Sequence, residues 1–168
     1  EMYLEDTAAF GSDWMVLAPG WEYVDDQREE NVKRAAESVQ ILAEKAETLG
    51  ITLIMEEMDE TATLFARDLS HLARIIKEAG SKQVKAGLDL ALARRRGEGI
   101  ADYTDAFGQI GHVRLSWPDG MPGKHDGAAW EEAALVRDQW YEKLSACGYD
   151  GVISLSLWGA DYYVNPDE

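Results

Sequence analysis

The sequence lacks several residue types and patterns that would mark common functional classes. Its single cysteine, Cys147, excludes an internal disulfide framework, and we therefore expect a cytoplasmic protein. It contains no zinc-site spacing, no glycine-rich phosphate loop and no nucleophile elbow. No apolar run approaches the ~20 residues of a membrane span, and no basic-then-apolar signal peptide opens the chain. We expect no membrane partner.

Basic residues are also scarce. Lys and Arg number 16 against 32 Asp and Glu, which gives a formal net charge of −16. Such a chain repels phosphate backbones, so nucleic acid is not an expected partner. Solubility alone explains most of the excess acid. The 168 residues, 46% of them hydrophobic, suit one globular domain that spans residues 1–168.

The sequence does contain an alternation of helical patterns and short apolar runs. A long helix is expected at Asn31–Leu49 and ends at Gly50, and another is expected at Asp68–Ala79 and ends at Gly80. Further helical segments are expected at Glu1–Phe10 and Ala128–Cys147, and a short helix or turn is expected at Tyr103–Ile110. Five strands are expected at Trp14–Ala18, Ile51–Met55, Val84–Asp89, His112–Leu115 and Val152–Leu157. Strands that alternate with helices form right-handed βαβ units, so the pattern predicts a parallel sheet.

Polar side chains gather at the predicted C-terminal ends of these strands, where ligands bind in parallel sheets and barrels. They are Glu56 and Glu57, Asp89, His112 with Arg114, and Ser154 with Ser156. Oxygen and nitrogen donors from three consecutive strands suit Mg²⁺ or Mn²⁺. A metal there could bridge adjacent oxygens of a sugar, while a carboxylate moves a proton on the carbon beside the carbonyl.

The order of the segments resembles the xylose-isomerase-like TIM barrels, the sugar phosphate isomerase/epimerase superfamily. The stretches that carry the resemblance are WMVLAPG, AETLG, ITLIMEEM, AGLDLALA, IGHVRLSW, the KHDG loop and GYDGVISLSLWG. The resemblance implies an α/β fold of the (β/α)8 TIM-barrel type, with the five strands matching strands four to eight. It implies a partial barrel, whose missing strands come from a longer chain or from another subunit.

The resemblance also assigns roles to residues at the strand ends. It implies that Glu56 binds a metal and takes part in proton transfer, and that Asp89 is a second metal ligand. The family's His-x-His pair is His112 followed by Arg114 in this sequence, so His112 becomes the substitute ligand. The position of the family's second catalytic Glu is occupied by Ser156. The implied cofactor is a divalent metal ion, Mn²⁺ or Mg²⁺.

Two functions are consistent with these residues. The first is isomerisation or epimerisation of a small sugar or related polyol, with Arg114 as an anchor for the substrate. Further substrate contacts are expected from His125, Trp117 and Trp158. The second is a metal-free relative that binds a small anion, a sugar or a partner chain, with Arg114 in a salt bridge to Glu56 or Asp89. Some members of the superfamily cut DNA with a zinc cluster, but the charge of −16 and only three histidines disfavour that activity.

Other polar residues are interpreted structurally. Glu57 alternates to the opposite face from Glu56, so we expect it to have a structural role. His71 falls on the polar side of its helix and is expected at the surface. Cys147 is expected to be buried at the end of a helix.

Overall fold

The computed structural model describes residues 2–20, 28–57, 66, 68–116 and 139–156. Its elements in chain order are α1 (Met2–Ala9), β1 (Trp14–Leu17), α2 (Arg28–Leu49), β2 (Thr52–Met55), α3 (Leu69–Ala79), β3 (Val84–Asp89), α4 (Leu90–Arg96), α5 (Ile100–Phe107), β4 (Ile110–Ser116) and β5 (Ile153–Ser156). Residues 139–146 are also helical. Of the helix expected at Ala128–Cys147, the first residues lie outside the described part.

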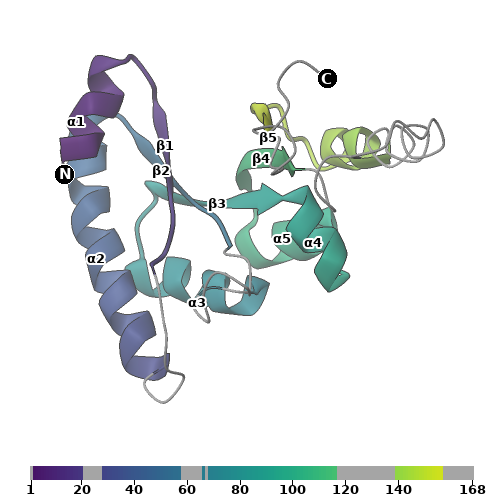
Figure 1. The fold of residues 1–168 in the computed structure, drawn as a ribbon, viewed down its shortest axis with the longest axis horizontal. Coiled ribbons are helices and arrows are strands. Elements are labelled where there is room, and N and C mark those ends of the chain that lie inside the picture. Colours follow the sequence, from purple (N-terminus) through teal and green to yellow (C-terminus); the bar gives the residue numbers. More distant parts are fainter. Residues whose placement is uncertain (1, 21–27, 58–65, 67, 117–138, 157–168) are drawn as a thin grey trace, which may run out of the picture.

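The five strands form one sheet in the order β1-β2-β3-β4-β5, and every neighbouring pair is parallel. This confirms the parallel α/β architecture and the five strands that the sequence predicts. Because the strand order follows the chain order, each connection moves one strand further around the same curve, as in a TIM barrel. The described part of the chain is therefore a half-barrel with helices on its outer side (Figure 1).

Alternation along the strands separates two faces of this sheet. Leu53 and Met55 of β2 pack in a cluster with buried residues of α1, α2 and α3, whereas Ile54 lies outside that cluster although it is also buried. In β3 the same alternation directs Val84, Ala86 and Leu88 toward the helices. The residues between them belong to the inner face of the half-barrel, opposite the helices.

Helix α2 covers β1 and β2 with a stripe of small and branched residues. The stripe consists of Val32, Ala36, Val39, Ala43 and Ala46, all at most 5% exposed, at spacings of four and three residues. This is the spacing of one helix face, so the stripe forms the part of the core that α2 shares with the strands. A second cluster joins β3, α4, α5 and β4 with Leu144 of the last helical segment.

Glycine ends two helices at the positions that the sequence predicts. Gly50, with φ +70°, follows α2. Gly80, with φ +62°, is the C-cap residue of α3, and its backbone N–H donates to the carbonyl oxygen of Ile76. A left-handed backbone conformation is cheap only for glycine, which explains why each helix stops there. At the other end of α3, the Asp68 carboxylate accepts a hydrogen bond of 2.8 Å from the His71 backbone N–H.

Some predicted boundaries differ from the observed ones. Helix α2 begins at Arg28, three residues before the predicted Asn31, and α5 spans Ile100–Phe107 where Tyr103–Ile110 was expected. Within the described residues, no helix is both long and apolar enough to cross a membrane.

Candidate ligand-binding site at the strand ends

Four polar residues of the inner face form one connected group, which we call the Glu56 network: Glu56, His112, Arg114 and Ser154. Glu56 directly follows β2, His112 and Arg114 are two residues apart in β4, and Ser154 is in β5. Glu56 lies at the C-terminal end of its strand, whereas His112 is the third and Arg114 the fifth of seven residues in β4, and Ser154 is the second of four in β5. The sheet therefore brings together side chains that are up to 98 residues apart in sequence, from Glu56 to Ser154.

Glu56 is the centre of this network. Glu56 is only 6% exposed to solvent. One carboxylate oxygen, Oε1, lies 3.2 Å from Nδ1 of His112, and the other, Oε2, forms an ion pair with the Arg114 guanidinium. Both oxygens of a buried carboxylate are thus engaged by nitrogen groups, which is what burial of a charge requires. The sequence allowed two roles for Arg114, a substrate anchor or an internal salt bridge. The ion pair with Glu56 is that internal salt bridge.

His112 links Glu56 to the next strand. Its Nε2 lies 2.8 Å from Oγ of Ser154, and its ring stacks on Trp14 of β1 with centroids 4.8 Å apart. A carboxylate can only accept, so Nδ1 donates to Glu56, and in a neutral ring Nε2 then accepts from the Ser154 hydroxyl. The imidazole is therefore held on two edges and one face.

Two glycines create the space for this arrangement. Gly87 of β3 pairs in register with His112, and a Cβ placed on Gly87 would lie 2.5 Å from Cγ of Glu56. In β4 a register shift leaves Gly111 between the pairs Ala86↔Ile110 and Gly87↔His112. This irregularity lets both Ile110 and Val113 join the helix-side cluster, while His112 lies on the inner face with Arg114.

Asp89, the other acid expected in the site, ends β3 and is 9% exposed. It stands opposite Arg114 in the register of β3 and β4. Its Oδ1 accepts a hydrogen bond of 3.2 Å from the backbone N–H of Leu92 in α4. The resemblance implied that Asp89 is a metal ligand, whereas this hydrogen bond is the contact of a side chain that caps the following helix.

Glu57 forms a second polar group on the opposite side of the strand end. Its carboxylate accepts a hydrogen bond of 2.6 Å from the Tyr103 hydroxyl and forms an ion pair with Arg96. Burial raises the pKa of Glu57 from the ordinary 4.5 to about 7, although the Tyr103 hydrogen bond acts in the other direction. These contacts tie the end of β2 to α4 and α5, in agreement with the structural role expected for Glu57.

Two sequence predictions about other residues are wrong. His71 is buried, and its Nδ1 accepts a hydrogen bond of 3.2 Å from the backbone N–H of Ala66. Cys147 is exposed, because it lies in the turn after the last helical segment rather than on its apolar face.

Three of the expected substrate contacts lie outside the described residues: Trp117, His125 and Trp158. Ser156 ends β5 in register with Ser116. Sequence reasoning did not identify the contributions of Trp14, Gly87 and Tyr103. The role of Gly87 could have been predicted from the sequence. It lies two positions before Asp89 and so on the same face of β3, where the absence of a side chain leaves room for side chains of the neighbouring strands.

The donors in this site do not fit the divalent metal that the resemblance implied. Both oxygens of Glu56 are engaged, one of them by a permanent cation, and both ring nitrogens of His112 have protein partners. In the ranges that the structure describes, no group of three or more His, Cys, Asp or Glu side chains is placed to hold a metal ion. The positive charge beside the Glu56 carboxylate is therefore supplied by the Arg114 side chain and not by a metal ion.

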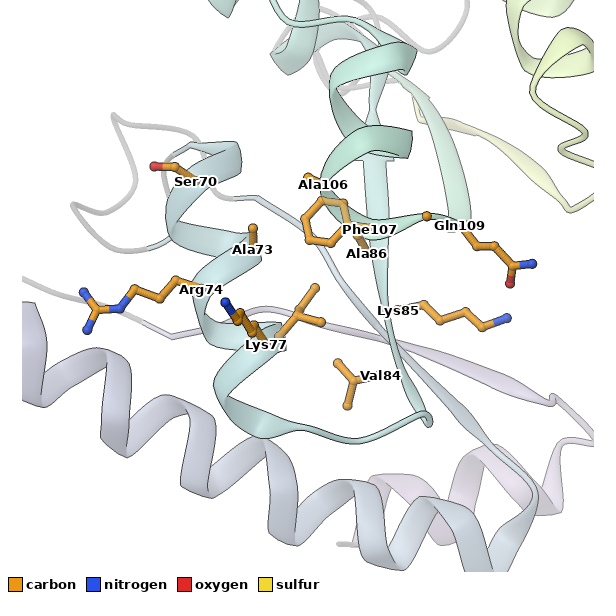
Figure 2. A pocket seen from close by; sticks show the side chains of 12 residues that line it. Ser70, Ala73, Arg74, Lys77, Val84, Lys85, Ala86, Ala106, Phe107 and Gln109 are labelled. Atoms are coloured by element: carbon orange, nitrogen blue, oxygen red, sulfur yellow. The ribbon is translucent and has the colours of Figure 1, made fainter.

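A groove of about 730 Å³ lies elsewhere, between α3, the beginning of β3 and the end of α5. Figure 2 shows Val84 and Phe107 beside it, with Arg74, Lys77 and Lys85 around them. It opens near the N-terminal end of β3, and no member of the Glu56 network lines it. Because ligands of such barrels bind at the C-terminal ends of the strands, the Glu56 network is the better candidate for function.

The fold agrees with the comparison to known families. Residues 1–168 match the family described as xylose isomerase-like TIM barrel. The chain belongs to this family. This confirms the resemblance on which the fold was predicted. No curated protein sequence matches the chain.

Solved structures of xylose isomerase-like TIM barrels have the same fold. The 3-keto-D-glucoside 4-epimerase from E. coli superimposes with a TM-score of 0.72 at 18% identity, over 94% of this chain and 62% of that one. The D-allulose 3-epimerase from Methylomonas sp., in complex with D-allulose, gives 0.74 at 18% identity, over 94% and 54%. A xylose isomerase domain containing protein from Salmonella typhimurium gives 0.66 at 21% identity, over 94% and 59%. This chain thus spans 54% to 62% of the length of these relatives.

Proposed function

We propose that this chain contributes the sugar-binding end of an isomerase/epimerase-type barrel and that its ligand is a neutral keto sugar or polyol. The observation that carries the proposal is the Glu56 network, a buried polar group on the inner face at the strand ends. Similar folds belong to sugar epimerases, one of them solved with D-allulose bound. The remaining barrel strands would come from a longer chain or from another subunit, and we propose the cytoplasm as the location.

Arg114 is the group best placed to contact a ligand. Its side chain is 30% exposed, whereas that of Glu56 is 7% exposed. A guanidinium has five N–H donors, and the ion pair with Glu56 leaves others available for sugar oxygens. Trp14 adds an aromatic surface next to His112, and we propose that Trp117, His125 and Trp158 also contact the sugar.

The charge of the site selects between the sugar and the anion that the sequence left open. Glu56 and Asp89 contribute two negative charges and Arg114 contributes one positive charge, so the formal charge of these three residues is negative, while Lys85 lies near the opposite end of β3. Two like charges several ångströms apart in a partly buried site repel by a few kcal/mol, about 2–4 at an effective dielectric constant of 20. A phosphate or carboxylate would add to this repulsion, and a neutral sugar would not.

Proton transfer beside the sugar carbonyl is the second candidate, with Glu56 as the base. The epimerase relatives and the buried position of Glu56 favour it. The ion pair with Arg114 opposes it, because both Glu56 oxygens already have protein partners, Arg114 at Oε2 and His112 at Oε1. For this reason sugar binding is the function that the geometry supports best, and catalysis is the function to be tested second.

Calorimetric titration of the full-length gene product tests the proposal. D-allulose, D-tagatose and D-fructose are titrated beside a phosphate ester of fructose, into the wild type, Arg114→Gln and the surface control Arg34→Gln. We expect neutral sugars to bind about tenfold more tightly than the ester, and Arg114→Gln to weaken binding by about tenfold or more. Arg34→Gln should bind like the wild type, because Arg34 is exposed and its ion pair among the described residues is with Glu30 on its own helix.

Two results would contradict the proposal: tighter binding of the ester, or equal binding by Arg114→Gln and the wild type. An epimerisation assay on the same sugars then decides between binding and catalysis. Turnover that disappears in Glu56→Gln while sugar binding persists would establish Glu56 as a base.

A further inference from the structure

The inner face places two acids close to each other with little solvent. Glu56 and Asp89 are 6% and 9% exposed and follow adjacent parallel strands. Carboxylates in such a position require a positive charge nearby, which either a bound metal ion or a basic side chain can supply. Arg114 stands opposite Asp89 in register and forms the ion pair with Glu56, so a basic side chain supplies the charge in this chain.

The neighbours of Glu56 complete its coordination without any added ion. The guanidinium engages Oε2, the imidazole engages Oε1 at 3.2 Å, and Ser154 holds the far nitrogen of the imidazole at 2.8 Å. Trp14 stacks on the same ring. A metal ion at Glu56 would have to share the carboxylate with Arg114 and His112 or displace one of them, and it could use His112 only by taking Nδ1 from Glu56 or Nε2 from Ser154.

We infer that the Arg114 guanidinium permanently occupies the cation position of this site, so that the site binds its ligand without a divalent metal. This inference rests on the proposed function for the location of the site. Its test measures metal binding and not sugar binding, so the inference and the proposed function can each fail without the other. A second consequence follows. Replacing Arg114 by histidine removes the cation and adds an imidazole beside Glu56, Asp89 and His112, which creates a metal site.

Titration of the chelator-treated full-length protein with Mn²⁺ tests the inference by calorimetry, with circular dichroism as the check of folding. The wild type is compared with Arg114→His, with Arg114→Ala and with Arg34→His, which adds a histidine on the exposed face of α2. We expect no Glu56-dependent site in the wild type or in Arg34→His. Arg114→His should bind one Mn²⁺ about tenfold or more tightly than Arg34→His does.

The wild type supplies the decisive outcome even if a variant fails to fold. One Mn²⁺ bound by the wild type and lost in Glu56→Gln would overturn the inference. It would also be overturned if folded Arg114→His and folded Arg114→Ala both bound no more Mn²⁺ than Arg34→His, because Arg114 would then not be what keeps the metal out. Loss of sugar binding with these metal results unchanged would contradict only the proposed function.

Discussion

Arg114 and Glu56 form an ion pair across a strand that lies between them. Arg114 belongs to β4 and Glu56 follows β2, and β3 separates these two strands in the sheet. The side chains meet over Gly87 of β3, where a Cβ would lie 2.5 Å from Cγ of Glu56. The pair therefore depends on a third residue that has no side chain, and this dependence can be tested.

Substituting Gly87 by alanine is expected to destabilise the protein by about 1–3 kcal/mol, because the methyl group overlaps the Glu56 side chain. The added Cβ would also approach Cγ2 of Ile54 to 2.9 Å. Chemical denaturation of the wild type and the variant measures the loss. Gly99→Ala is the matched control, since a Cβ there meets only Asp102 at 3.6 Å and the loss should stay below about 1 kcal/mol. Equal losses in the two variants would contradict the packing argument.

Removing only one partner of the ion pair should cost more than removing both. Arg114→Gln leaves the buried Glu56 carboxylate without its cation, and we expect a loss of about 2 kcal/mol, moderated because Arg114 is 30% exposed. The double variant with Glu56→Gln should recover part of that loss, which gives a coupling energy of about 1 kcal/mol or more in a double-mutant cycle. The exposed pair Arg34 and Glu30 should couple by less than that. A coupling of zero between Arg114 and Glu56 would contradict the prediction.

The Glu57 carboxyl is expected to make stability depend on pH. Its pKa is about 7 in the folded protein, against an ordinary 4.5, so the folded state holds more protons than the unfolded state between these values. The free energy of unfolding should therefore fall as pH rises from about 4.5 to about 7, by at most about 3 kcal/mol, and level off above. Denaturation at several pH values, compared between the wild type, Glu57→Gln and the exposed Glu37→Gln, isolates the effect. Parallel profiles for the wild type and Glu57→Gln would refute it.

Tyr103→Phe should destabilise the protein by about 1–2 kcal/mol, because the buried Glu57 carboxylate loses the hydroxyl that donates to it at 2.6 Å. The same hydrogen bond lowers the pKa of Glu57, so its loss should raise that pKa and extend the fall in stability to pH values above about 7. Tyr3→Phe is the control, since Tyr3 is 71% exposed. If the two variants unfold at the same denaturant concentration, the hydrogen bond contributes nothing to stability.

Local patterns in the sequence predicted the elements of the fold well. Val84–Asp89 has the predicted bounds, and Gly50 and Gly80 end their helices as expected. These features depend on periodicity and on the conformational preference of single residues, which can be read from a short segment. Family resemblance then supplied the barrel, which periodicity alone could not distinguish from an open sheet.

Contacts between distant segments were much less predictable. The sequence left Arg114 open as a substrate anchor or an internal partner, because the choice depends on its distance from a residue 58 positions earlier. The partners of Glu57 come from α4 and α5, 39 and 46 residues away. His71 was expected at the surface from its place on the helix alone, but Ala66 covers it. Burial by another segment leaves no periodic trace in the sequence.

The most direct measurement of the central claim is nuclear magnetic resonance of the His112 ring nitrogens in the chelator-treated full-length protein, before and after addition of Mn²⁺. We predict a protonated Nδ1 and an acceptor Nε2, as its hydrogen bonds to Glu56 and Ser154 require. We also predict that stoichiometric Mn²⁺ leaves both signals unbroadened, because Arg114 holds Glu56. Selective loss of the His112 signals at one equivalent of Mn²⁺ would show that the metal enters the site and would contradict the account.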